Sequence, residues 1–544
     1  MDVNRRDLLK VGGLGGLGVA ALAAPWGQTV RAKSASTLAG RNFPLRYASA
    51  FVRPRVLTPY ERTVDADGAP LHRYELTQTL ASAEILRGLS TPILSYGGSF
   101  PGPTISVERG TRVQLTVRNR LPLLHPQWAY PLDTSTHLHG SASLPQFDGY
   151  ANDLTYSAYR KTYHFPNHQP ARTLWYHDHA VHHTAQNAYS GLAAMYQLHD
   201  PEERQLLPQD QFDVPVIVTD AMFDAAGRLA YNDNTSSGLW GDVILVNGVA
   251  WPVMKVEPRI YRFRILNASI SRSFRFMLST GDPVTVVATD GGLMPQAQRV
   301  TSWRHGGAER YEVLVDFRGR RGQRVELRNA SNANNVDYAL TGSVMAFDVL
   351  DMEPTTTRLD DKGVAVPDPT WNTLPGTLVR SDAMDLKASD ARATRRFRLK
   401  KDLLGVWTIG DQSWEEIVRS GYTSTLANPG LGDVEIWELE NSSGGWFHPV
   451  HIHLVDFQIL SRNGRPPMDH ERGPKDVVYL GERETVRLLM RFGPHEGKYM
   501  VHCHNLPHED HDMMSQFRVG PPKNPDPNDP IEAAHCTPDE ALVG

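Results

Sequence analysis

The sequence predicts an all-β protein built from sandwich or barrel domains. Glycine (44 residues) and proline (38 residues) are spread along the 544-residue chain, and they separate short stretches with alternating apolar residues. In residues 112–119, Val113, Leu115 and Val117 alternate with polar side chains, as expected of a strand with one buried face. Long amphipathic helices are scarce, and similar short stretches cover residues 214–219, 261–266, 311–317 and 485–492. Short strands at this spacing are typical of β sandwiches and barrels.

A weak internal repeat suggests three related domains. Residues 103–108 begin with proline and precede a stretch that ends at Asn119, and residues 252–257 likewise precede one that ends at Asn267. A third and weaker copy ends at Asn441. We therefore expect three domains and a linker rich in Asp, Pro, Thr and Gly, with the domains at residues 33–203, 204–351 and 394–544 and the linker at 352–393.

The N-terminus has the pattern of an export signal. Arg5 and Arg6 precede an apolar, glycine-rich run at residues 11–25, as in signals read by the twin-arginine (Tat) export machinery. A buried helix is the alternative for this segment. We expect residues 1–32 to be removed, with cleavage after Ala32, and the mature protein to be periplasmic or extracellular. The run is too short for a comfortable membrane span, so no stable membrane anchor is expected after signal removal.

Charge and cysteine content argue against a nucleic-acid-binding protein and a disulfide-rich protein. The chain has 56 basic and 61 acidic residues, hence a net charge of −5, and it lacks basic runs. This balance argues against nucleic acid as a partner. The two cysteines, Cys503 and Cys536, are too few for a disulfide framework. We expect Cys536 to be an exposed thiol in the C-terminal tail, and an intermolecular role is the alternative.

Histidine is the unusual component of the composition. Of 22 histidines, nine lie between His137 and His199 and nine between His448 and His511. Two dense clusters far apart in the sequence suggest a metal site that folding assembles. The clusters contain four short motifs: His137-Leu138-His139-Gly140, Trp175-Tyr176-His177-Asp178-His179, His448-Pro449-Val450-His451-Ile452-His453, and His502-Cys503-His504 followed by His508 and Met513.

The fourth motif predicts two metal centres on opposite sides of one strand. Residues 498–504 read as a strand, which places His502 and His504 on one face and Cys503 on the other. A cysteine thiolate with two imidazoles and a weak thioether is a blue-copper ligand set, here Cys503 with His448, His508 and Met513. The eight remaining motif histidines suit three coppers, two with three ligands each and one with two. Zinc is the alternative, but zinc sites rarely need ten histidines.

These motifs resemble those of multicopper oxidases, in the expected order and over nearly the whole mature chain. The resemblance is strongest to the branch of bilirubin oxidases and bacterial spore-coat laccases. It is carried by residues 502–514, His-Cys-His-Asn-Leu-Pro-His-Glu-Asp-His-Asp-Met-Met, and by residues 448–457 and 171–179. It implies three cupredoxin-like Greek-key domains, four coppers per chain, and a trinuclear copper cluster between the first and third domains.

The resemblance also implies a role for each ligand. The type 1 copper takes His448, Cys503, His508 and Met513, and the type 2 copper takes His137 and His451. One type 3 copper takes His139, His177 and His504, and the other takes His179, His453 and His502. The acids that assist proton delivery correspond to Asp148 and Glu509, whose alternatives are a turn aspartate and a solvated glutamate.

The expected activity is the oxidation of phenols, aromatic amines or bilirubin-like tetrapyrroles, coupled to four-electron reduction of O2 to water. A small reducing substrate docks near His448, whose ring edge we expect to lie toward the surface, and Cys503 passes each electron to its neighbours His502 and His504. Trp446 either borders the substrate pocket or is a core aromatic residue. The alternatives are a cuprous oxidase for copper tolerance, although the 14 methionines form no methionine-rich run, and a non-enzymatic exported cupredoxin-like protein.

Overall fold

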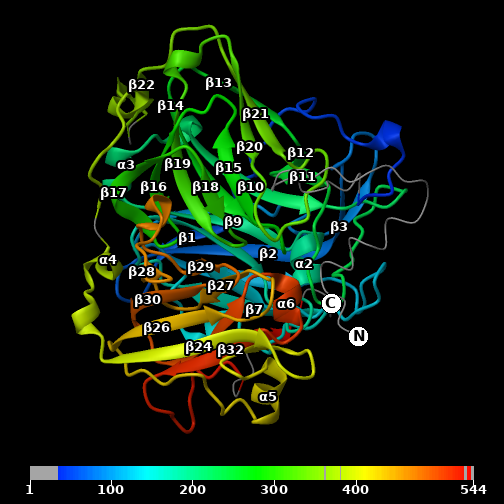
Figure 1. Ribbon diagram of the computed structural model, residues 1–544, viewed down its shortest axis with the longest axis vertical. Helices are drawn as coiled ribbons and strands as arrows, with labels where there is room; N and C mark the ends of the chain where they lie inside the picture. Colours follow the sequence, from blue (N-terminus) through cyan, green and yellow to red (C-terminus); the bar gives the residue numbers. More distant parts are fainter. Residues whose placement is uncertain (1–34, 361–362, 380, 532–535, 541–544) are drawn as a thin grey trace, which may run out of the picture.

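The computed structural model describes residues 35–360, 363–379, 381–531 and 536–540 (Figure 1). The predicted export signal, residues 1–32, lies outside these ranges. No helix within them is both long enough and apolar enough to cross a membrane.

The first domain consists of two sheets that pack face to face over one apolar core. The six-stranded sheet contains β1 (Glu61–Val64), β2 (Pro70–Ala83), β3 (Thr91–Tyr96), β5 (Arg112–Asn119), β7 (Tyr159–Phe165) and β33 (Cys536–Pro538). The four-stranded sheet contains β4 (Ile105–Glu108), β9 (Ala193–His199), β8 (Arg172–Asp178) and β6 (Thr136–His139), in this order.

The C-terminal strand β33 follows the third domain in the sequence, but it pairs with β7 and so belongs to this sheet of the first domain. Cys536 is therefore not an exposed tail thiol. It lies in β33 opposite Lys161 and is only partly exposed, so that prediction was wrong. The physical reason is the pairing of β33 with β7, which holds the C-terminal segment against the first domain.

The second domain repeats the two-sheet plan. Its larger sheet contains β10 (Asp213–Ala221), β11 (Val243–Val246), β12 (Val249–Ala250), β14 (Ile260–Asn267), β16 (Val284–Thr289), β17 (Gly292–Val300) and β19 (Arg310–Asp316). Its smaller sheet contains β13 (Val253–Val256), β15 (Phe274–Leu278), β18 (Trp303–His305), β20 (Arg324–Asn329) and β21 (Ser343–Val349). The expected linker holds a small hairpin of β22 (Thr357–Leu359) and β23 (Ala365–Pro367).

The third domain again packs two sheets over one core. One sheet contains β24 (Ala393–Lys401), β25 (Trp407–Ile409), β26 (Val434–Asn441), β28 (Phe457–Arg462) and β30 (Thr485–Arg491). The other contains β29 (Val477–Leu480), β27 (His448–Ile452), β31 (Gly497–Cys503) and β32 (Met514–Val519), in this order.

Helices are short, and most lie between strands. The α-helices are α2 (Thr184–Ser190), α3 (Pro201–Leu206), α4 (Asp382–Asp385), α5 (Trp414–Arg419) and α6 (Leu506–Asp510). The 3-10 helices are η1 (Gly40–Asn42), η2 (Pro145–Phe147), η3 (Asp210–Phe212), η4 (Arg318–Arg320), η5 (Pro369–Trp371), η6 (Ala388–Asp390) and η7 (Asp469–Glu471). The all-β prediction is confirmed.

The sequence repeat has a structural cause at three buried asparagines. Asn119, Asn267 and Asn441 end β5, β14 and β26, and each of these strands has a parallel neighbour, β2, β10 and β24 respectively. Each asparagine side chain accepts the backbone N–H two residues later and donates to two backbone carbonyls. The same side chain therefore fixes the same turn in all three domains, including the copy that is weakest in the sequence.

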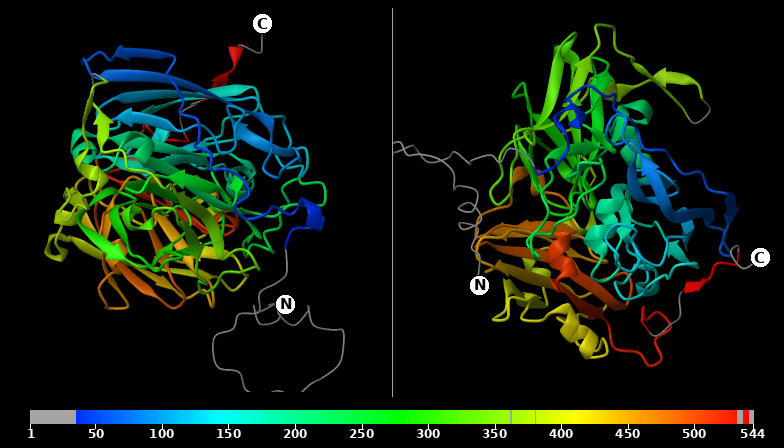
Figure 2. Two further views of the ribbon diagram at one scale, coloured as in Figure 1. Left: turned by 90° about the horizontal axis from the view of Figure 1, so that it is seen from above. Right: turned by 90° about the vertical axis from the view of Figure 1, so that its right-hand side faces the viewer.

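The three domains surround a common centre (Figure 2). Strand pairing brings the two histidine motifs of the first domain side by side, since His137 pairs with His177 between β6 and β8. In the third domain, His451 pairs with His502 between β27 and β31. The two pairs of strands face each other, and the ring centroids of His139 and His451 are 3.6 Å apart.

Candidate metal centres

The first candidate centre surrounds Cys503, the last residue of β31. The Nδ1 atom of His448 lies 3.4 Å from the Cys503 sulfur and 3.2 Å from Nδ1 of His508. Nδ1 of His508 lies 3.7 Å from the same sulfur. Backbone hydrogen bonds from Cys503 to Met513 and from Met513 to His508 close the loop around α6. The structure thus brings the sulfur and two imidazoles together, with Met513 buried in the same loop.

The outer nitrogens of both imidazoles are held by hydrogen bonds. Nε2 of His448 lies 2.8 Å from the Ser443 hydroxyl, which itself donates to Asn441 at 2.6 Å. Nε2 of His508 lies 3.2 Å from the carbonyl oxygen of Ser237, which belongs to the second domain. With the ring protons on these outer nitrogens, both Nδ1 lone pairs face the sulfur. Burial raises the pKa of the Cys503 thiol well above its ordinary value, so a thiolate here requires a neighbouring cation.

The expectation that the His448 ring edge lies toward the surface is wrong. Both His448 and His508 are fully buried, each 0% exposed. Trp407 packs on both rings, at centroid distances of 5.5 Å and 4.2 Å. The partly exposed Trp446 lies 5.6 Å from the His508 ring, edge to face. Two indoles and the loop that carries Ser443 therefore separate this centre from water.

The second candidate centre contains eight buried imidazoles. Pairs from β6 and β8 in the first domain meet pairs from β27 and β31 in the third. None is more than 1% exposed, and the eight are His137, His139, His177, His179, His451, His453, His502 and His504. The structure brings together all the histidines that the motifs singled out for this centre. The side chain of Cys503 faces the other centre, as the strand alternation predicted.

Three of these rings converge on one point. Nε2 of His502 lies 3.2 Å from Nε2 of His179 and 3.2 Å from Nε2 of His453. The Nδ1 atoms of these rings face carboxylates instead. These carboxylates favour the tautomer with the proton on Nδ1, which leaves three lone pairs pointing at one another, and that is favourable only around a cation.

Four of the other five rings have one anchored and one free nitrogen, and the fifth, His504, has two free nitrogens. His137 and His451 bond through Nδ1 to the backbone carbonyls of Asp148 and Asp476. His139 is turned the other way, since its Nε2 lies 3.2 Å from the Asp476 carboxylate. The buried nitrogens without a hydrogen-bond partner are Nε2 of His137, His177 and His451, Nδ1 of His139, and both nitrogens of His504. Anchoring one ring nitrogen and freeing the other is typical of metal ligands, so the donor set fits copper.

Grouping by distance gives compact donor sets. In each set, the ligand atoms lie within 4.8 Å of one another. These sets include His179 with His453 and His502, His137 with His139 and His177, His137 with His451 and His453, and His448 with Cys503 and His508.

Asp148 and Glu509 both touch the second centre, as predicted of neighbouring acids. The Asp148 carboxylate lies 2.7 Å from Nδ1 of His453, and burial raises its pKa well above the ordinary value. Glu509 lies 2.8 Å from Nδ1 of His502 and 3.4 Å from Nδ1 of His179. Burial acts to raise the pKa of Glu509, but these two rings lower it to about 2. Neither acid is a solvated side chain, since each is 3% exposed.

Sequence reasoning missed a buried ion pair at this centre. Arg310, from β19 of the second domain, donates to Asp476 through Nη1 at 2.7 Å, and Asp476 in turn contacts His139. A Cβ atom on Gly140 would meet Asp476 at 2.6 Å and Arg310 at 2.7 Å, and Gly140 has a φ of +88°. The glycine that follows His139 is thus the one local signal of this close approach.

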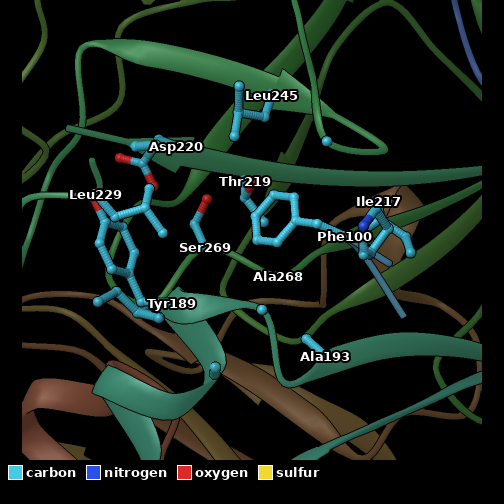
Figure 3. A pocket seen from close by; sticks show the side chains of 16 residues that line it. Phe100, Tyr189, Ala193, Ile217, Thr219, Asp220, Leu229, Leu245, Ala268 and Ser269 are labelled. Carbon is cyan, nitrogen blue, oxygen red and sulfur yellow. The ribbon is translucent and has the colours of Figure 1, made fainter. Parts of the chain in front are cut away.

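A small cavity is lined by residues of the first and second domains, among them Tyr189 and Asp220 (Figure 3). Its volume is about 30 Å³, and two buried polar atoms without a hydrogen-bond partner, on Asp220 and Ser269, belong to its lining. Ile270, another lining residue, accepts the N–H of Leu506 at 2.8 Å. Leu506 lies between His504 and His508, so the cavity wall helps to hold the segment that joins the two centres.

Comparisons with known proteins agree with this geometry. Three domain-family models, each described as multicopper oxidase, match residues 78–203, 175–339 and 392–523. The chain is 41% identical over 452 residues to a bilirubin oxidase of Albifimbria verrucaria, covering 79% of this chain and 73% of that protein. It is 31% identical to a laccase of Bacillus subtilis, covering 88% and 99%. The crystal structure of the McoA multicopper oxidase of Aquifex aeolicus superimposes with a TM-score of 0.74 at 28% identity, covering 88% and 100%.

Proposed function

The chain belongs to the multicopper oxidase family, and from this premise we propose that it couples one-electron oxidation of an aromatic reductant to four-electron reduction of O2 to water. Phenols, aromatic amines and bilirubin-like tetrapyrroles are the proposed reductants. Relatives named bilirubin oxidase and laccase support this range. The observation that carries the proposal is the convergence of buried ring nitrogens, with no hydrogen-bond partner, from the first and third domains.

We propose four coppers per chain. His448, Cys503, His508 and Met513 would hold the type 1 copper, and His137 and His451 the type 2 copper. His139, His177 and His504 would hold one type 3 copper, and His179, His453 and His502 the other. The anchored outer nitrogens support these assignments, because they leave one lone pair on each anchored ring for a metal, as on His448, His508 and His451.

Bound copper would supply one-electron transfer at the first centre and O2 reduction at the second. The protein contributes the connection, since Cys503 of the first centre is covalently continuous with His502 and His504 of the second. It also contributes exclusion of water, since all these rings are buried. Asp148, whose pKa is raised, would hold a proton at a carboxylate oxygen that faces His453, whereas Glu509, whose pKa is lowered, would accept and relay protons beside His502. Both carboxyl groups lie where O2 reduction consumes protons.

The reductant would approach beside Trp446. This residue is partly exposed, and its ring lies edge-on to His508 at 5.6 Å. Electron transfer through His508 thus needs no direct contact between reductant and copper. Trp446 would form one wall of the substrate pocket, and the surrounding loops would determine which reductant binds.

A turnover panel on copper-loaded protein tests the proposal. Oxygen consumption is measured with bilirubin, 2,6-dimethoxyphenol and cuprous ion, together with copper content and absorbance near about 600 nm. We expect about four coppers per chain, a blue band, and turnover of the organic reductants. Colourless protein with at most one metal per chain would overturn the proposal, and faster turnover of cuprous ion would favour a copper-tolerance role. Cys503→Ser is the matched control, expected to lose both colour and turnover.

We further propose that the Tat machinery exports the protein to the periplasm or beyond the cell. Arg5 and Arg6 support this proposal, because Tat carries folded proteins and so permits copper loading before export. Replacing both residues by lysine keeps the charge and should retain the protein in the cytoplasm in a fractionation experiment. Unchanged export of this variant would rule out the Tat route.

A further inference from the structure

We propose that the Lys401 ammonium, held over the indole of Trp407, raises the reduction potential of the copper at His448, Cys503 and His508. The inference deepens the proposed function and rests on it, since it requires copper at this centre. Lys401 would act on the copper electrostatically, from a distance, and would bind neither copper nor reductant.

Trp407 is the side chain that connects the surface to the imidazoles. Its ring is fully buried, and its centroid lies 4.2 Å from that of His508 at an interplanar angle of 33°. The His448 ring lies 5.5 Å away at 78°. Nε1 of Trp407 donates to the carbonyl oxygen of Ser236 in the second domain at 3.1 Å. The indole is thus fixed against both imidazoles of the candidate type 1 centre.

The hairpin register places Lys401 beside this indole. Lys401 and Trp407 are cross-strand partners at the end of β24 and β25, and Nζ lies 4.5 Å from the indole centroid. The hairpin tip is closed by Asp402, whose N–H donates to Val406 at 2.9 Å and whose carboxylate accepts two backbone N–H groups. A cation over an indole is a favourable contact in itself, so the ammonium has a reason to stay there.

The charge of Lys401 reaches the centre. Its Nζ lies 4.5 Å from the Trp407 centroid, and that centroid lies 4.2 Å from that of the His508 ring, so a single indole separates the ammonium from a ligand of this centre. A positive charge at this distance opposes the additional positive charge of oxidised copper relative to reduced copper. The buried indole keeps water from the space between them, which weakens dielectric screening. Lys401 therefore favours the reduced state and raises the potential.

The adjacent Lys400 is a matched control in the same strand. Strand alternation directs it to the opposite face, where its ammonium lies 2.5 Å from the Asp411 carboxylate. Lys400 pairs with Thr408 in the register, so it has the same backbone setting without the indole. If any surface charge changed the potential of the copper, replacing either lysine would shift it equally. We expect a shift only when Lys401 is replaced.

The test is a redox titration of copper-loaded protein, followed by the blue band. At a fixed ambient potential, we expect the ratio of reduced to oxidised type 1 copper in Lys401→Gln to be lower than in the wild type by about three- to tenfold. Lys401→Arg should restore the ratio, and Lys400→Gln should leave it unchanged. Lys401→Met, which keeps the aliphatic stem over the indole, should match Lys401→Gln and serves if the glutamine variant folds poorly.

Two outcomes would overturn the inference while leaving the proposed function intact. The first is a wild-type blue band with the same ratio in the Lys401→Gln or Lys401→Met variant. The second is an equal shift in Lys400→Gln. Absence of a blue band from the copper-loaded wild type would instead overturn the proposed function and, with it, this inference.

Discussion

Nε2 of His179 and Nε2 of His502 lie 3.2 Å apart, although the two residues come from different domains. Behind each ring, Nδ1 faces the same carboxylate, that of Glu509. One buried acid therefore orients a ligand from the first domain and a ligand from the third. This arrangement makes Glu509 part of the junction between the domains as well as a candidate proton relay.

Replacing Glu509 by glutamine should impair the second centre and spare the first. A glutamine can accept a hydrogen bond from one ring only, and it presents an NH2 group to the other. We expect turnover to fall by about 10- to 100-fold with the blue band retained. Oxygen consumption and copper content measure the effect. Glu415→Gln, in the exposed turn of α5, is the control and should leave turnover unchanged. Turnover of Glu509→Gln equal to that of the wild type would exclude the role given to Glu509.

Asp148 should act through both its charge state and its hydrogen bond to His453. Burial raises its pKa well above the ordinary value, so the protonated acid persists to higher pH than a solvated aspartate would. If the protonated form supplies a proton, the wild-type rate falls as the pH rises through the pKa of Asp148. Asp148→Asn keeps an acceptor for His453 and should retain copper, with a lower rate that no longer follows this pH change.

A pair of Asp148 variants separates the two roles. Asp148→Ala removes the acceptor as well and should lose copper from the second centre, which metal analysis would detect. The pH profile of oxygen consumption is the measurement for Asp148→Asn. An unchanged profile in that variant would show that another group supplies the proton.

The fold and most of the site could be predicted because their signals are local. Val113, Leu115 and Val117 mark a strand by period two, and Asn119 ends it by bonding to nearby backbone. The two faces of β31 follow from the same periodicity. Cys503 and His502 can therefore be assigned to different metal centres without tertiary information. The His-x-His pairs lie on strands or at their ends, where one residue spacing keeps both rings on one side.

Much of what could not be predicted depends on how the second domain packs. Arg310 and Ser237 reach the two centres from a domain without ligands of its own, and no motif marks them. The second error, the burial of His448, arises within the third domain, where Trp407 covers it from a hairpin about 40 residues earlier in the chain. Both kinds of contact are tertiary, and single-strand periodicity does not encode them.

Met513 should lower the potential of the first centre as an axial thioether. Met513→Leu conserves volume in a fully buried position, so we expect a stable protein that keeps its blue band. Without the sulfur, oxidised copper loses a ligand, and the ratio of reduced to oxidised copper at fixed potential should rise. Met514→Leu is the control, because Met514 packs in a separate cluster with Tyr150 and Met500. A fall in the ratio for Met513→Leu would contradict the axial role.

A buried ion network in the second domain should make stability depend on pH. Arg264 donates to Glu203 at 2.7 Å, to Asp213 at 2.8 Å and to Glu312 at 3.0 Å, all inside the protein. Burial alone would raise the pKa of Glu203, but Arg262 and Arg264 hold it well below the ordinary value. A depressed pKa contributes stability that is present above the ordinary glutamate pKa, about 4.3, and is lost as the pH falls.

Arg264→Met should therefore destabilise the protein by about 3–5 kcal/mol at pH 7, because it removes one of the two buried guanidinium groups that hold these carboxylates. As the pH falls toward and below about 4.3, the carboxylates of the variant take up protons before those of the wild type, and the difference in stability should shrink. Thermal unfolding at neutral and acidic pH measures both effects. Arg318→Met breaks an ion pair with Asp316 that is 39% and 32% exposed, and it should cost less than about 1 kcal/mol. An equal loss of stability from Arg264→Met at both pH values would show that packing, and not charge, is what Arg264 contributes.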